Sequence, residues 1–405
     1  MRRGKSLTLG ARRKEFEYFR IDNGRDKYPG WVQPSEPVTM SVDEFSKRSN
    51  AGEHLLFFAS LRRQELSALA GDLPSVAKYS KLAAKGEVNA HVWMGSAGAT
   101  STLHYDTAHN SYLQLHGRKR FLLLPPSYTA GMPTYPEAHP SNRQARPPPL
   151  LRDPVADVVA QALGDEDHRS QGERVVVTDA LLSPGDVLLL PAHWLHYVIA
   201  LDLSFSVNLW VNSREETTVS QLLAPPHPWP DGLVVASEQL YVQSCLLTLL
   251  RGAVPTLGEQ ARTDAEGSVD IFLSRMLVRK GFGEIGPYAA GCVAPPEVAA
   301  KVAASGMSAD ERRAQCRKIG LPEDCMQEDP WARKIASRAA RAASIFGGEE
   351  VELHTTFPPV TLFLSRETRV VHLERLVEIY AKRTVGAGEV GAFVRSCLCT
   401  RCGAV

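Results

Sequence analysis

The first 240 residues of the chain contain no cysteine, and all seven cysteines lie after them. A chain of 405 residues that is 44% hydrophobic can bury a core without disulfide bonds. Because the cysteine spacing suggests no disulfide framework, we expect a reducing, intracellular compartment, cytoplasmic or nuclear. Cys397, Cys399 and Cys402 form a C-x-C-x-x-C cluster, but a structural zinc site needs four ligands. We expect a frayed tail with ordinary thiols there, with metal binding as the alternative.

The chain also lacks an excess of charge of one sign, since 46 Lys and Arg residues face 45 Asp and Glu residues. This balance argues against a general nucleic-acid coat protein. No apolar run approaches the roughly 18 residues of a membrane span, so we expect no membrane partner. Residues 1–14 are basic but no long apolar stretch follows them, as a signal peptide would require. We expect residues 1–35 to form a disordered basic arm rather than a targeting segment.

Residues 36–215 alternate between short apolar runs and clusters of Gly, Pro and Asn. The runs predict strands over 54–59, 89–95, 111–117, 120–126, 173–182, 186–192 and 205–211. Many short strands at this spacing predict an all-β barrel or a double-sheet jelly roll.

Residues 216–405 have a different pattern, with apolar residues at helical spacing over 237–254, 330–348 and 368–384. The sequence therefore predicts a mainly β domain followed by a mainly α C-terminal region, without internal repeats. The apolar face around Tyr241–Leu250 has two interpretations, a homodimer interface or packing against the chain's own barrel. The sequence leaves both open.

A candidate metal site begins with His104 and Asp106, which form an H-x-D pair. Residues i and i+2 of a strand point to the same face, so both side chains can reach one ion. A third ligand must come from another strand, and the segment 184–200 offers His193 and His196 after a Pro-Gly-Asp turn signal. Two histidines and one carboxylate are the facial triad of non-haem Fe(II) oxygenases.

Four stretches resemble the JmjC-domain, cupin-like 2-oxoglutarate oxygenases, in the family's order and spacing. They are LHYDTAHNSYLQLHGRKRFLLLPP, TYPEAHPSNRQ, SPGDVLLLPAHWLH and FSVNLWV, which lie between residues 103 and 211, and the resemblance covers roughly residues 50–212. The likeness is greatest to the small hydroxylase branch that includes the asparaginyl hydroxylase of hypoxia-inducible factor. It implies that residues 36–215 form a double-stranded β-helix (a jelly-roll or cupin domain) that uses Fe(II), 2-oxoglutarate and O2.

The resemblance also implies roles for individual residues. The family's P-x-x-W-x-H pattern matches Pro191, Trp194 and His196, so the iron ligands would be His104, Asp106 and His196. His193 would then face solvent or support the ligands from behind.

The resemblance implies that Lys119 binds the distal carboxylate of 2-oxoglutarate, because such pairing is strong in a low-dielectric site. Ser101 would assist it, and Asn110 and Asn208 would line the iron-bound end. Arg118 and Arg120 would point away from the site. Where the asparaginyl hydroxylase has a tyrosine at the distal carboxylate, this chain has Leu56, and Tyr112 or another hydroxyl is the candidate replacement.

The segment TYPEAHPSNRQ resembles the family's substrate-facing loop, in which Arg143 and Gln144 would contact a peptide. We expect apolar walls that exclude water from the site, formed by Leu122, Leu124, Val187 and Leu189.

The function that this resemblance implies is hydroxylation of a protein side chain, with release of succinate and CO2. A tRNA-base hydroxylase and a histone lysine demethylase are alternatives of the same fold. In the tRNA case, the helix 332–346 would be an RNA-binding face rather than an ordinary solvated helix. A non-catalytic cupin scaffold is the alternative of another class.

Overall fold

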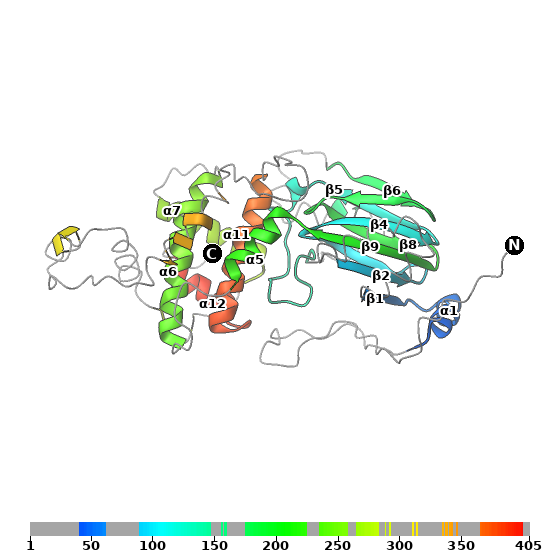
Figure 1. Ribbon diagram of the computed structural model, residues 1–405, viewed down its shortest axis with the longest axis horizontal. Helices are drawn as coiled ribbons and strands as arrows, with labels where there is room; N and C mark the ends of the chain where they lie inside the picture. The colour runs from blue at the N-terminus through cyan, green and yellow to red at the C-terminus, as the bar shows by residue number, and fades with distance from the viewer. Residues whose placement is uncertain are drawn as a thin grey trace.

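The computed structural model describes residues 40–61, 89–146, 175–224, 235–257, 265–282 and 365–399, with isolated positions between them. A β sandwich forms one half of the molecule and helices form the other (Figure 1). Residues 1–35, where the sequence predicts a basic arm, lie outside the described residues.

The sandwich has two antiparallel sheets. The five-stranded sheet has the order β1 (Leu56–Leu61), β2 (Asn89–Gly95), β9 (Ser204–Asn212), β4 (Ala108–His116) and β7 (Val187–Leu190). The four-stranded sheet has the order β3 (Thr100–Tyr105), β8 (Leu195–Ala200), β5 (Lys119–Leu124) and β6 (Thr178–Leu182). From β2 to β5, and again from β6 to β9, consecutive strands alternate between the two sheets. The predicted jelly-roll fold is confirmed.

Strands β3 and β8 were not among the predicted strands. Their inward positions carry polar side chains, including Ser101, His104 and His196, so neither strand has the apolar alternation that identifies a half-buried strand. These two strands carry both candidate histidine ligands. The polar residues that obscured the strands are therefore the ones that form the site.

The turn between β4 and β5 requires a glycine. Gly117 has φ +64°, and a Cβ atom at this position would lie 2.2 Å from the carbonyl oxygen of Leu203. No other residue tolerates both the left-handed conformation and this close approach. The tight turn sets the register in which Lys119, two residues later, enters the sandwich.

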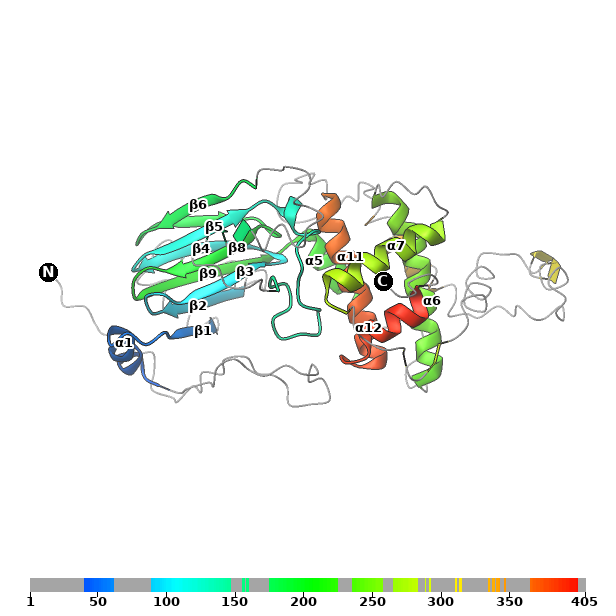
Figure 2. The ribbon, with the colours of Figure 1, turned by 180° about the vertical axis from the view of Figure 1, so that it is seen from behind.

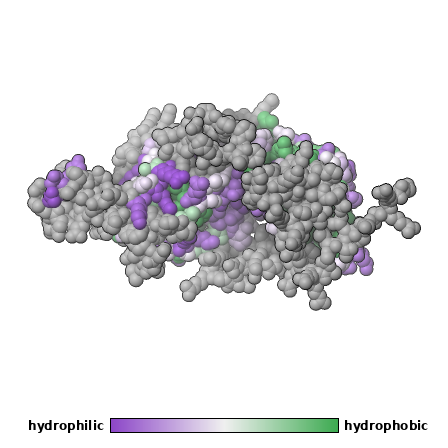
Figure 3. Space-filling model, in the orientation of Figure 1, coloured by the Kyte–Doolittle hydropathy of each residue, from purple (hydrophilic) through white to green (hydrophobic). Residues whose placement is uncertain are grey.

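The expected apolar walls are wrong by one residue in each strand. Leu122 and Leu124 are fully buried, but they face outward and pack in a cluster with Leu103 and Met132. Val187 and Leu189 are 51% and 68% exposed, and apolar atoms are visible along the upper edge of the sandwich (Figure 3). A shift of one residue moves every side chain of a strand to the opposite face. The inner core is instead formed by Tyr112, Phe121, Leu123, Leu182 and Leu190.

The helices are α1 (Val42–Asn50), α5 (Arg214–Leu223), α6 (Val235–Ala253), α7 (Ala265–Arg279), α11 (Arg366–Val385) and α12 (Val390–Phe393). Short turns lie at η1 (Pro126–Tyr128), η3 (Val254–Leu257) and η5 (Val394–Leu398). Ser41, Ser213 and Ser365 cap α1, α5 and α11, each accepting a backbone N–H of the first turn. Helices α6 and α11 confirm the predictions over 237–254 and 368–384, and the described positions within 330–348 that have an assigned structure are helical.

The apolar face of α6 packs inside the chain. Val242, Leu246, Leu249 and Leu250 are at most 2% exposed, in one core with residues of α7, α11 and α12. Helix α6 is long and apolar enough to cross a membrane, but 61% of its apolar window is buried inside the protein, which is typical of a core helix. The face around Tyr241–Leu250 therefore packs against the other helices rather than against the barrel, and a dimer through the helical region stays a prediction.

The cysteine cluster is not a frayed tail. Cys397 and Cys399 are 2% and 7% exposed and lie at the end of η5 in the helical core. Cys397 forms a disulfide bond with Cys292, and Cys399 is disulfide-bonded as well. The expectation of ordinary thiols is wrong because partners distant in the sequence meet here. Cys402 lies outside the described residues, and the compartment stays a prediction.

Candidate metal centre

Three side chains meet at the inner surface of the four-stranded sheet. His104 lies on β3 and His196 lies directly opposite it on β8, so the two imidazole rings are 4.0 Å apart between centroids. Asp106 follows the end of β3, and its Oδ2 lies 3.6 Å from Nε2 of His196. One ligand atom from each of the three residues lies within 4.8 Å of the other two. The predicted triad is therefore assembled by strand pairing.

Backbone carbonyls orient both imidazole rings. Nδ1 of His104 lies 2.6 Å from the carbonyl oxygen of Thr102, and Nδ1 of His196 lies 3.0 Å from that of Trp194. A carbonyl only accepts, so each Nδ1 carries the proton and each Nε2 presents its lone pair. Burial, followed by the neighbouring His104, lowers the pKa of His196 to about 4. The ring is thus held in the neutral form that binds metals.

This donor set fits an iron(II) ion. Two imidazoles and one carboxylate are the ligands of non-haem Fe(II) oxygenases, and three protein ligands leave coordination positions open for other molecules. A structural zinc site would be closed by a fourth side chain. Among the residues that the structure describes, no fourth His, Cys, Asp or Glu joins the group.

His193 neither binds the metal nor faces solvent. It is 3% exposed and lies in the turn before β8, where its ring contacts His372 of α11. The part of the expectation that placed it in solvent is wrong, because α11 covers this turn. Its backbone N–H donates to the carbonyl of Asp106 over 2.8 Å. His193 therefore holds the backbone of a candidate ligand without contributing a ligand atom.

Lys119 is a buried cation on the inner surface. Its side chain enters the sandwich from the start of β5 and is 4% exposed as a residue. Nζ donates to the hydroxyl of Tyr112 over 2.6 Å and to that of Ser206 over 3.2 Å. No carboxylate of the described residues pairs with it, and burial alone lowers its pKa to about 7. An unpaired buried ammonium group indicates a site for an anion.

Tyr112 supplies the hydroxyl that Leu56 cannot. Its oxygen lies between Lys119 and Ser206, 2.5 Å from Oγ of the latter. Strand pairing places Tyr112 on the inner face, directly opposite Asn208. Leu56 is only partly buried, at the start of edge strand β1. The candidate replacement named from the sequence therefore lies where an anion held by Lys119 would need it.

The remaining predicted cosubstrate residues also face inward. Ser101 lies opposite Val198, which packs against the inner core. Asn208 is 1% exposed and accepts a hydrogen bond from Nε1 of Trp93 over 3.2 Å. Asn110 is 6% exposed, and its Oδ1 has no hydrogen-bond partner among the described residues. A buried carbonyl oxygen without a partner is costly, which favours a bound molecule beside it.

Sequence reasoning missed the aromatic side of this surface. His91 on β2 lies between Phe58 and Trp210, at centroid distances of 5.0 and 4.4 Å. Nδ1 of His91 and Nε1 of Trp210 are buried and, within the described structure, have no hydrogen-bond partner. The alternation Asn89, His91, Trp93 in the predicted strand was the available signal, since these residues share the inner face.

The predicted substrate residues lie on a loop beside β3. Gln144 forms a bridge with His104, and its Oε1 accepts from the Thr102 hydroxyl over 3.1 Å. The adjacent Arg143 has φ +64°, a left-handed conformation that is uncommon outside glycine. The two arginines beside Lys119 point outward as expected, where Arg118 pairs with Asp202 and Arg120 pairs with Asp179.

Comparisons with known proteins agree with this geometry. Residues 16–217 match the family described as "Cupin-like domain". The chain is 33% identical over 171 residues to Jumonji C domain-containing protein 5 of Drosophila melanogaster, covering 41% of this chain and 39% of that one. It is 30% identical over 128 residues to Lysine-specific demethylase 8 of Xenopus tropicalis, covering 32% and 26%. It is 29% identical over 187 residues to tRNA wybutosine-synthesizing protein 4 of Gibberella zeae, covering 44% and 17%.

The chain thus spans less than two-fifths of the length of these relatives. A solved cupin superfamily protein from Desulfitobacterium hafniense is 11% identical to this chain. The match covers 39% of this chain and 79% of that one, and its TM-score is 0.19. None of the three relatives is named as an asparaginyl hydroxylase, so that narrower resemblance stays a prediction. The chain therefore contains a cupin-like domain, matched over residues 16–217, whose relatives include a protein named for the Jumonji C domain.

Proposed function

We propose that this protein is an Fe(II)- and 2-oxoglutarate-dependent dioxygenase that hydroxylates a protein side chain, with release of succinate and CO2. The observation that carries the proposal is that the triad shares one inner surface with buried Lys119, which no carboxylate of the described residues neutralises. A metal triad alone would fit many metalloproteins. Together, the two features match a molecule that binds a metal at one end and carries a carboxylate at the other.

The strand register supports this match. On β5, Lys119 and Leu123 face inward, and Leu123 lies opposite His196. Four residues of strand separate them, which is roughly 13 Å along the backbone. A lysine side chain and a short dicarboxylate together suit this gap. Phe121 and Leu123, at most 5% exposed, lie between the two ends and exclude water.

A bound Fe(II) ion would supply the oxidising chemistry with O2, and the protein supplies binding and orientation. His104, Asp106 and His196 would hold the metal. Lys119, with the hydroxyl of Tyr112, would hold the distal carboxylate of the cosubstrate. Burial strengthens this charge pairing, because the surroundings screen it less than water does.

A protein side chain is the proposed substrate because of the loop at 132–146. It runs beside β3, with Gln144 next to His104, so an extended peptide bound along it would pass the metal centre. Lysine-specific demethylase 8, similar over part of its length, is named for a protein residue. Histone lysine demethylation therefore remains a variant of this proposal.

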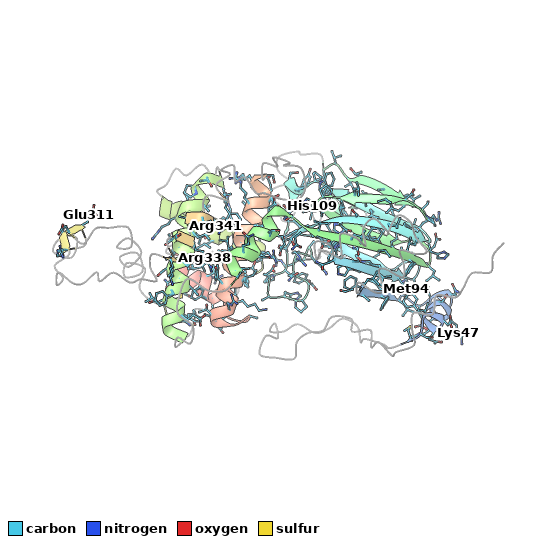
Figure 4. All side chains as sticks on the ribbon, viewed as in Figure 1. Lys47, Met94, His109, Glu311, Arg338 and Arg341 are labelled. Atoms are coloured by element: carbon cyan, nitrogen blue, oxygen red, sulfur yellow. A yellow bond between two sulfur atoms is a disulfide. The ribbon has the colours of Figure 1, made fainter. Side chains whose placement is uncertain are left out.

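The tRNA-base hydroxylase is the weaker alternative, although one relative is named for tRNA modification. In the helix considered as an RNA-binding face, Arg338 donates to the carbonyl of Ala224 and Arg341 to the side chain of Gln221. Figure 4 places both arginines in the helical half, away from His109 at the near end of the sandwich. These guanidinium groups thus contact the end of α5, within the chain's own fold.

Succinate formation tests the proposed function. Purified protein with Fe(II), ascorbate, O2 and 2-oxoglutarate should produce succinate above background. His104→Ala should abolish this, and Lys119→Ala should lower the rate at limiting 2-oxoglutarate by about 30-fold or more, because it removes one partner of a buried charge pair. Arg120→Ala is the matched control, since it removes the neighbouring cation on the outer face and should leave the rate unchanged.

The binding step separates the remaining explanations. If the parent protein binds Fe(II) and 2-oxoglutarate without oxygen but forms no succinate, turnover requires the substrate, and candidate peptides and tRNA are added next. If it binds neither, the enzyme proposal fails and the non-catalytic scaffold takes its place.

A further inference from the structure

Helix α11 lies at the end of the sandwich, between the strands and helices α6 and α7 (Figure 2). Its residue Val371 is 1% exposed and packs in one cluster with Leu103 and Tyr105, which flank His104 on β3. The inner face of β3 thus presents a candidate metal ligand, while its outer face belongs to the same apolar cluster as a residue of α11.

The next residue of α11 reaches the turn before β8. His372 is fully buried, and its Nε2 lies 2.7 Å from Nε2 of His193. Burial lowers the pKa of both imidazoles, that of His193 to about 4, so the pair is neutral. Two neutral imidazoles at this distance share one hydrogen bond, in which one Nε2 donates and the other accepts.

His193 is held in a conformation that it would not adopt freely. Its φ of +67° is left-handed, which is uncommon for a residue with a side chain and persists only where the surroundings enforce it. The backbone on either side of this ring contacts two metal ligands. The N–H of His193 donates to the carbonyl of Asp106 over 2.8 Å, and the carbonyl of Trp194 orients His196 over 3.0 Å.

We propose that His372 is a positioning residue for the metal centre, which holds the 191–194 turn through His193 and thereby sets Asp106 and His196. The C-terminal helical region then completes the metal site rather than only adding stability. The proposal rests on the proposed function only in requiring that the triad binds a metal.

The test is the affinity for Co(II), measured without oxygen by the visible absorption of the bound ion, which also reports its coordination geometry. His372→Leu fills a similar space without a hydrogen-bonding group, so it should weaken Co(II) binding by about tenfold and alter the spectrum. His372→Gln restores an amide that can donate or accept, and it should recover most of the affinity. Leu376→Ala is the control, because Leu376 is fully buried on the same helix but packs in the helical core.

The control separates positioning from folding. Leu376→Ala should lower the melting temperature at least as much as His372→Leu, since it leaves a cavity, yet bind Co(II) like the parent. If His372→Leu also binds with unchanged affinity and spectrum, the proposal is overturned while the proposed function stands. If the parent binds neither Co(II) nor Fe(II), the proposed function falls, and this inference falls with it.

Discussion

At the scale of single residues, the most informative side chain is Lys119. A lysine with 4% exposure, whose hydrogen-bond partners among the described residues are hydroxyls, is unfavourable in its charged form, so burial lowers its pKa to about 7. A bound dicarboxylate would stabilise the charged form. Cosubstrate binding and protonation of Lys119 are therefore linked.

The affinity for 2-oxoglutarate should consequently fall as the pH rises. Binding favours protonated Lys119, so above about pH 7 the complex must take up a proton, and the affinity drops up to tenfold per pH unit. Anaerobic calorimetry from pH 6.5 to 9 would measure this. Lys119→Arg remains charged throughout and should show a much flatter profile. An equally flat profile for the parent would contradict the assigned role.

At the scale of elements, buried ion pairs hold the loop at 132–146 against the helices. Glu378 of α11 accepts the backbone N–H of Glu137 over 2.6 Å and pairs with Lys280 over 3.1 Å. Arg375 donates to Glu137 over 2.9 Å, and Arg279 of α7 donates to the carbonyl of Met132 over 3.2 Å. The loop that borders the metal centre therefore depends on α7 and α11 for its position.

Replacing Glu378 by Gln should loosen this loop. The amide can still accept the N–H of Glu137, but it removes the carboxylate that pairs directly with Lys280, which is 3% exposed. Breaking a buried pair from one side costs about 3–5 kcal/mol. Urea unfolding would measure that loss, and hydrogen exchange should quicken over residues 132–146. Arg120→Met removes an exposed ion pair and should leave both measurements near those of the parent. If hydrogen exchange over residues 132–146 is unchanged in Glu378→Gln, the ion pairs of Glu378 do not hold the loop.

At the scale of the whole molecule, the sandwich and the helical region form one structure. Their contact is both apolar, through Val371, and polar, through His372 and the ion pairs of α11. The face of the helical half visible in Figure 3 is mainly hydrophilic, while its apolar residues pack inside. A covalent bond between Cys292 and Cys397 closes a loop of 105 residues across this helical half.

Cys292→Ser should therefore lower the free energy of unfolding under non-reducing conditions. The chain-entropy account assigns about 5 kcal/mol to a closed loop of this length. Thermal unfolding of the variant and the parent, both purified without reductant, would show the difference. Cys245→Ser, which replaces the buried free thiol, is the comparison for a change of side chain alone. Equal stability of Cys292→Ser and the parent would mean that the bond does not constrain the chain.

Much of the site follows from local sequence. The H-x-D spacing places His104 and Asp106 together because strand side chains alternate. The turn at Gly117 directs Lys119 inward and its two neighbours outward for the same reason. The apolar periodicity of 237–254 and 368–384 identifies helices because each buries one face. These features depend on residues within a few positions of one another, and the sequence by itself determined them.

The tertiary structure alone decided which distant residues meet. In β5, Leu122 faces outward and Phe121 faces inward. Because both residues are apolar, the sequence does not show which one faces inward until the register with the partner strand is known. The contact of His193 with His372 spans 179 residues, and the bond of Cys292 with Cys397 spans 105. Such pairs are set by how whole elements pack, which no local pattern records. For this reason the H-x-D half of the candidate metal site was readable from the residues themselves and His196 only through the family's pattern. The helix over 368–384 was also readable, but its contact with the turn before His196 was not.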